Sequence, residues 1–124
     1  MSDKIIIKRT GMQRILYAFV HSYNGFKWLL KHEAAFKQEV LLFIPLTLLA
    51  FWLDVTALER CALILALGFV LFAEMTNSAI EAVVDRIGLD YHELSGVAKN
   101  VGSGLVLLSM FMAGFVWLSI LILN

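Results

Sequence analysis

The sequence has little of several residue types, and each shortage excludes a class of protein. A single cysteine, Cys61, leaves no partner for an internal disulfide or a cysteine-based metal cluster. Charged residues make up only 16% of the chain, whereas soluble domains average about a quarter. The formal net charge is zero, which argues against a nucleic-acid-binding protein that relies on bulk positive charge. A phosphate-binding GxxxxGK[ST] loop is also absent from the sequence.

Hydrophobic residues, in contrast, are abundant. They account for 60% of the 124 residues, and the mean hydropathy is +0.83. Three long apolar segments predict transmembrane helices over 34–53, 61–84 and 101–123, because a helix needs about 20 apolar residues to cross a bilayer. The one proline, Pro45, is expected to kink or loosen the first span. The sequence therefore predicts an all-α integral membrane protein with a single domain over 1–124, inserted without cleavage of a signal peptide.

The segment before these spans has a different pattern. Over 11–33, apolar and aromatic residues recur every three or four positions, and basic residues fall largely between them. This pattern is typical of an amphipathic helix that lies in the membrane interface. The segment could be a surface anchor and nothing more.

The positions of the basic residues predict the orientation. Seven of the ten Lys and Arg residues precede the apolar run that begins at Val40, and the segment 85–100 carries two more, Arg86 and Lys99. By the positive-inside rule, the N-terminus and the segment 85–100 are cytoplasmic, while the DVTALER loop and the C-terminus lie outside. If the first helix begins near Ala34, Lys37 and Glu39 are expected near the interface.

The second predicted span contains an unusual line of polar residues. Glu74, Ser78, Glu81 and Asp85 follow one another at helical spacings of four, three and four, with Asn77 slightly to one side. A charged side chain at the centre of a membrane helix costs about 2.5–3.5 kcal/mol on insertion scales, so such residues usually serve a function. Asn77 and Ser78 alone could instead hydrogen-bond between helices.

Carboxylates in this setting suit two kinds of chemistry. They could hold Mg²⁺ together with phosphate oxygens, or one of them could act as a general base. Glu33 and Lys99 are placed at the same cytoplasmic boundary by the predicted topology, and Lys99 could either hold phosphate or only balance charge. From the residues alone, a phosphoryl-transfer enzyme and an oligomeric channel or transporter for cations or protons both remain open.

A resemblance adds to this reading. The stretch EMTNSAIEAVVDRIGLDYHELSGVAKN, with NGFKWLLKHEAAFKQE and WLDVTALER upstream, closely resembles the prokaryotic diacylglycerol kinases. The resemblance implies a homotrimeric membrane lipid kinase in the cytoplasmic membrane, which transfers phosphate from ATP, with Mg²⁺, to diacylglycerol. Relatives of the same kind phosphorylate undecaprenol instead.

The resemblance also implies roles for individual residues. Glu74 would be the general base, assisted by Asn77 and Lys99, and Glu33 and Glu81 would bind Mg²⁺ with the nucleotide. The remaining implied nucleotide contacts are Arg14, His21, Asp90, Tyr91, His92, Lys99 and Asn100, and the implied lipid contacts are Arg14 and Ser103. Asn100 stands where the family typically has Asp, and His21 stands where Tyr is expected.

Overall fold

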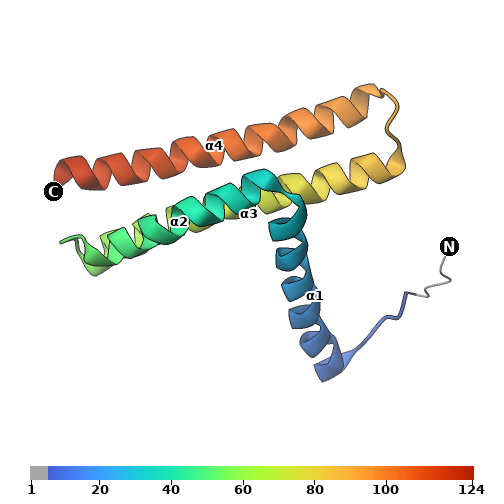
Figure 1. Ribbon diagram of the computed structural model, residues 1–124, viewed down its shortest axis with the longest axis horizontal. Coiled ribbons are helices and arrows are strands. Elements are labelled where there is room, and N and C mark those ends of the chain that lie inside the picture. The colour runs from blue at the N-terminus through green and yellow to red at the C-terminus, as the bar shows by residue number, and fades with distance from the viewer. Residues whose placement is uncertain (1–5) are drawn as a thin grey trace.

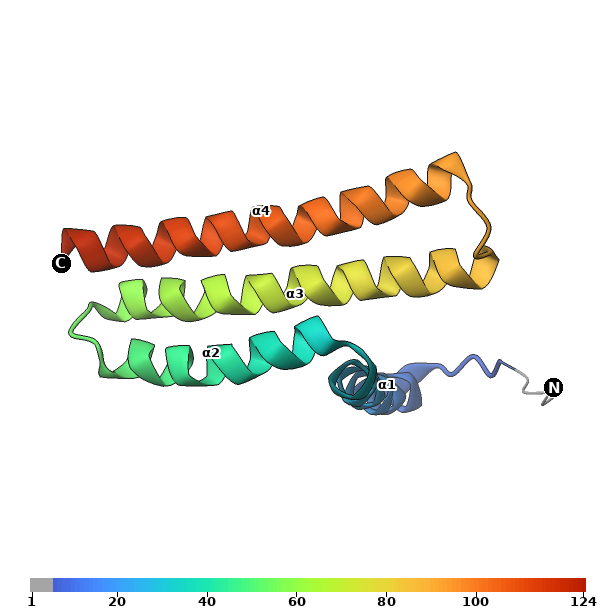
Figure 2. The same ribbon diagram turned by 45° about the horizontal axis from the view of Figure 1, so that its top comes forward.

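A computed structural model describes residues 6–124 and contains four helices within that range. They are α1 (Gly11–His32), α2 (Ala34–Trp52), α3 (Ala57–Ile87) and α4 (Glu93–Leu123). α2, α3 and α4 run side by side, with the turn between α3 and α4 at one end and the C-terminus at the other (Figures 1 and 2). α1 leaves this group at a steep angle from the start of α2 (Figure 1).

α3 is the central helix and packs against both α2 and α4. Ala50 of α2 and Leu63 of α3 are fully buried, and the indole Nε1–H of Trp117 on α4 donates to the carbonyl oxygen of Leu63 at 3.1 Å. These contacts lie at the end of the molecule that holds the α2–α3 turn. They fix how far each neighbouring helix is shifted along α3.

The helix ends next to this turn are held by specific hydrogen bonds. α3 begins with a capping box, in which the hydroxyl of Thr56 accepts from the amide of Glu59 at 3.2 Å and the Glu59 carboxylate accepts from the amide of Thr56 at 3.3 Å. The Arg60 guanidinium donates to the carbonyl oxygens of Ala50 at 2.9 Å and Leu53 at 3.0 Å. Arg60 thus satisfies carbonyl groups at the end of α2 that a helix terminus leaves free.

The buried core is small, and most large apolar side chains face outward. α2, α3 and α4 are each long and apolar enough to cross a membrane. Side chains such as Leu41, Phe51, Leu65, Phe111 and Phe115 are more than 60% exposed, which suits a lipid environment. The all-α membrane fold with three spans is therefore confirmed. On α1 only Leu29 is buried, as expected for a helix that lies on a surface.

The helices extend beyond the predicted spans. α3 begins at Ala57 rather than 61 and ends at Ile87 rather than 84, and α4 begins at Glu93 rather than 101. α2 continues through Pro45 to Trp52 as a single helix. Which portions of these helices lie in the bilayer stays a prediction from the sequence.

Candidate functional site

The polar line of α3 begins at a buried position. The Glu74 side chain is only 8% exposed and Ser78 is 7% exposed, although both lie on a helix whose other polar residues are more accessible. Ala73 and Val70, just before them, are buried and apolar. A carboxyl group at Glu74 is therefore shielded from bulk water within a single chain.

The Glu39 carboxyl of α2 is a neighbour of the Glu74 carboxyl of α3. One oxygen of Glu39, Oε2, is buried and has no hydrogen-bond partner among the described residues. From the sequence, Glu39 is placed near the interface and is not connected with the polar line. The sequence does contain a signal for this position, since Phe36, Glu39, Phe43 and Ala50 share one face of α2, and Phe36 and Ala50 are buried.

Asn77 of α3 contacts Glu81 on the same helix and Gly102 on α4. Its amide Nδ2 donates to Oε1 of Glu81 at 3.3 Å, while its own Oδ1 is buried without a partner among the described residues. Gly102 of α4 faces this oxygen so closely that a Cβ at position 102 would collide with it. α4 can approach Asn77 here because residue 102 has no side chain.

Asp85 and Lys99 form an ion pair at the end of the line. Lys99 Nζ on α4 lies 2.7 Å from Oδ1 of Asp85 on α3, and both side chains are about half exposed. The two helices therefore bring Lys99 to the same face as Glu81 and Asp85. From the sequence, Lys99 is placed near this end of the polar line and Asp85 is assigned no role.

The turn between α3 and α4 forms a hollow beside this ion pair. Lys99 shares its lining with Asp90, Tyr91 and His92, and its volume is about 280 Å³. His92 also caps α4, since its ring Nδ1 accepts from the amide of Leu94 at 3.1 Å. Four residues that the resemblance associates with nucleotide are thus gathered around one depression.

The other predicted site residues are more dispersed. Arg14 lines a groove on α1 with Gly11, Ala18 and Ser22, and His21 is exposed on the same helix. Glu33 is half-buried in the bend between α1 and α2, where its backbone amide donates to Leu29 at 2.9 Å. Asn100 and Ser103 are exposed on α4, on either side of the Gly102 contact.

The predicted metal ligands, Glu33 and Glu81, fit Mg²⁺ in kind. Carboxylate oxygens are suitable ligands, and the hydrogen bond from Asn77 orients Glu81. Among residues 6–124, no cluster of three His, Cys, Asp or Glu side chains is arranged to hold a metal ion. Two carboxylates would suffice for Mg²⁺, which usually takes one or two from the protein and completes its shell with water and phosphate oxygens.

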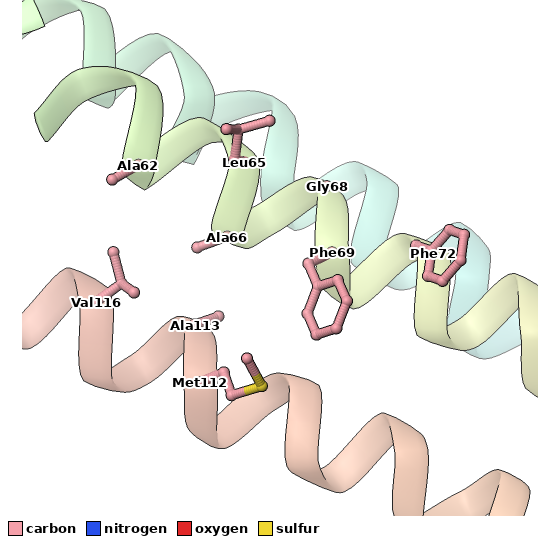
Figure 3. A pocket seen from close by; sticks show the side chains of 9 residues that line it. All are labelled: Ala62, Leu65, Ala66, Gly68, Phe69, Phe72, Met112, Ala113 and Val116. Carbon is pink, nitrogen blue, oxygen red and sulfur yellow. The ribbon is translucent and has the colours of Figure 1, made fainter. Parts of the chain in front are cut away.

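A further pocket lies between α3 and α4, away from these polar groups. Its volume is about 550 Å³, and it is lined by apolar residues, among which Phe69 and Met112 face the gap between the helices (Figure 3). The lining contains no titratable side chain, so this pocket is no candidate for the chemistry of the polar line.

Comparison with known proteins gives a consistent result. Residues 20–121 match the family model described as prokaryotic diacylglycerol kinase. Diacylglycerol kinase from Escherichia coli K12 is 46% identical over 108 residues, which cover 87% of this chain and 88% of the relative. Diacylglycerol kinase from Pseudomonas aeruginosa is 42% identical over 122 residues, covering 98% and 99%. The Haemophilus influenzae protein of the same name is 40% identical over 114 residues, covering 92% and 97%.

Proposed function

Because the chain belongs to the prokaryotic diacylglycerol kinase family, we propose that it transfers the γ-phosphate of ATP to the primary hydroxyl of diacylglycerol and forms phosphatidic acid. The protein is an enzyme, a lipid kinase with membrane-spanning helices. The observation that carries the proposal is the polar line from the buried Glu74 to the ion pair of Lys99 and Asp85.

Glu74 is the general base in this proposal. Its carboxyl group is shielded from water at membrane depth, where a lipid hydroxyl can approach from the bilayer. Glu74 accepts the hydroxyl proton, the lipid oxygen bonds to the γ-phosphorus, and the bond from that phosphorus to the β–γ bridging oxygen breaks. ADP leaves with the electron pair of that bond, so the atoms and charges balance.

The residues nearer the cytoplasmic end hold the nucleotide. Lys99 offers a point charge to the phosphates, and Asn77 positions Glu81 and the reacting group. Asp90, Tyr91 and His92 supply the hollow for the nucleotide, with Arg14, His21 and Asn100 as further contacts and Arg14 and Ser103 beside the lipid. When bound by Glu33 and Glu81 with ATP, Mg²⁺ would neutralise phosphate charge.

The enzyme works as a homotrimer in the cytoplasmic membrane, with its N-terminus in the cytoplasm. Arg14 and His21 lie on α1, which leaves the other helices at a steep angle (Figure 1), and contacts between subunits would complete the set. The distribution of Lys and Arg supports this orientation, because it puts the hollow on the side where ATP is found.

A path for cations or protons is the less favoured function. Beyond Glu74, the buried residues of α3 are apolar, namely Val70, Leu67 and Leu63. The polar line therefore stops at about the middle of the helix and does not continue to the opposite end.

The test is transfer of labelled phosphate from Mg·ATP by purified protein in mixed micelles. We expect phosphorylation of diacylglycerol, loss of more than ~100-fold in kcat with Glu74→Gln, and normal turnover with Asp54→Asn, a carboxylate-to-amide control in the α2–α3 turn. Undecaprenol is assayed in parallel, because relatives with that substrate are hard to distinguish by sequence. Folded protein that phosphorylates neither lipid would contradict the kinase proposal, and normal turnover by Glu74→Gln would contradict the assignment of the base.

A further inference from the structure

A groove with a volume of about 310 Å³ lies where the end of α1 meets α3. Its lining residues come from both helices: Trp28 and Leu29 of α1, and Met75, Ser78, Ala79 and Ala82 of α3. Ser78 carries the only hydroxyl group of this lining, and it stands four residues after Glu74 on the same face of α3. A molecule that contacts Ser78 in this groove therefore lies one helical turn from the proposed base.

The wall that α1 supplies is held in place by local contacts. The Trp28 and His32 rings stack with their centroids 4.5 Å apart, and His32 Nδ1 lies 3.0 Å from the Trp28 carbonyl oxygen. Leu29 is only 7% exposed, which ties this end of α1 to the neighbouring helices. The groove is therefore a packed feature of the fold.

Ser78 belongs to the polar line, but it has no role in the proposed reaction. The residue is only 7% exposed. Thr76 and Ser109 donate their hydroxyls to carbonyl oxygens of their own helices, at 2.8 and 2.6 Å, whereas the Ser78 hydroxyl has no such partner within residues 6–124. A hydroxyl that is shielded from water is costly to leave unpaired. An acceptor atom on a molecule in the groove would complete its hydrogen bonding.

Diacylglycerol supplies such an acceptor next to the reacting hydroxyl. Its primary hydroxyl and its nearest ester are on adjacent carbons of glycerol, and side chains four residues apart on a helix are about 5–6 Å from each other. The hydroxyl can therefore face Glu74 while an ester carbonyl faces Ser78. The apolar parts of Trp28, Leu29 and Met75 suit the acyl chains that follow the esters.

We propose that Ser78 determines part of the lipid specificity, because its hydroxyl donates a hydrogen bond to an ester carbonyl of diacylglycerol. This inference rests on the proposed kinase function and on Glu74 as its base. A lipid alcohol without esters, such as undecaprenol, would leave Ser78 unpaired, and a site of this kind discriminates against such a molecule. α1 is then part of the lipid site, because Trp28 and Leu29 form one of its walls.

The test compares diacylglycerol with a dialkylglycerol, in which ether links replace both esters and the primary hydroxyl is unchanged. Wild-type protein should phosphorylate the dialkylglycerol with a kcat/KM ~3- to 10-fold lower, the effect of losing one neutral hydrogen bond. Ser78→Ala should treat the two lipids alike, and its kcat/KM for diacylglycerol should fall to the wild-type value for the ether lipid. Ser78→Cys, with a weak donor of similar size, should behave in the same way.

Ser109→Ala is the matched control, since Ser109 is a buried serine, 1% exposed, whose hydroxyl is already paired within α4. It should keep the wild-type preference for the ester lipid. A Ser78→Ala variant that keeps this preference, or a wild type that shows none, would overturn the role of Ser78 and leave the kinase function in place. A folded wild type that phosphorylates neither glycerol lipid would instead contradict diacylglycerol as the substrate, and the role of Ser78 with it.

Discussion

At the scale of single residues, Gly102 controls the position of Asn77. Replacement with alanine would place a Cβ against the Asn77 amide oxygen, and the flexible end of Asn77 would have to move. Since the same amide group donates to Glu81, we expect Gly102→Ala to lower kcat ~10-fold or more.

Gly104 provides the matched control for this variant. It lies two residues further along α4, and a Cβ there would meet nothing within 4 Å. Gly104→Ala should keep full activity and slightly raise the unfolding temperature, because alanine favours helix. Equal activity in the two alanine variants would show that the close contact has no functional role.

Asp85 is the residue of the polar line whose role could not be predicted from the sequence. Its ion pair with Lys99 is half exposed, so it should add little to stability, but it holds the lysine beside the hollow that we propose for the nucleotide. We therefore expect Asp85→Asn to raise KM for ATP ~3- to 10-fold with little change in the unfolding temperature. Steady-state kinetics with varied Mg·ATP measure this, with Asp54→Asn as control, and an unchanged KM would remove Asp85 from the site.

At the scale of helices, Arg60 joins α2 to α3. Its guanidinium donates to Ala50 and Leu53, and more distantly to Val55 at 3.4 Å. Lysine keeps the charge but cannot donate to several carbonyls from a planar fork. Arg60→Lys should therefore reduce the free energy of unfolding by ~1.5–3 kcal/mol.

Unfolding in detergent micelles, followed by circular dichroism, measures the effect of Arg60→Lys. Arg86→Lys is the control, since Arg86 is exposed in the last turn of α3. If both variants unfold with the same midpoint, the hydrogen bonds of Arg60 do not hold the helix end.

The difference between Glu74 and Glu39 shows what the sequence can predict. Glu74 stands in a long apolar run, so its cost of insertion alone marks it as functional. Glu39 follows Lys37 and Gln38 and looks like part of a hydrated helix start. Its burial depends on how far α2 is shifted along α3, which is set by the turn and by contacts such as Ala50 with Arg60. Such contacts between distant residues leave little trace in local periodicity.

At the scale of the whole molecule, the topology predicts which ends are accessible from each side. The α3–α4 turn lies opposite the C-terminus, where Asn124 hydrogen-bonds to Glu59 (Figure 2). In a Cys61→Ser background, cysteine at Asp90 should react with an impermeant thiol reagent only from the cytoplasmic side. Cysteine at Asn124 should react only from the outside. Labelling of both positions from the same side would contradict the topology.

The unequal lengths of α2 and α3 have a consequence at this scale as well. α2 has 19 residues and α3 has 31, and with Glu39 opposite Glu74 the start of α2 falls near residue 79 of α3. The last eight or so residues of α3, about 12 Å, therefore extend past α2 without its cover. In the proposed reaction, Glu74 lies on the bilayer side of this step in helix length, and the phosphates of ATP bind on its aqueous side. The length of a single helix, α2, could thus set the level in the membrane at which a water-insoluble lipid and the water-soluble ATP react.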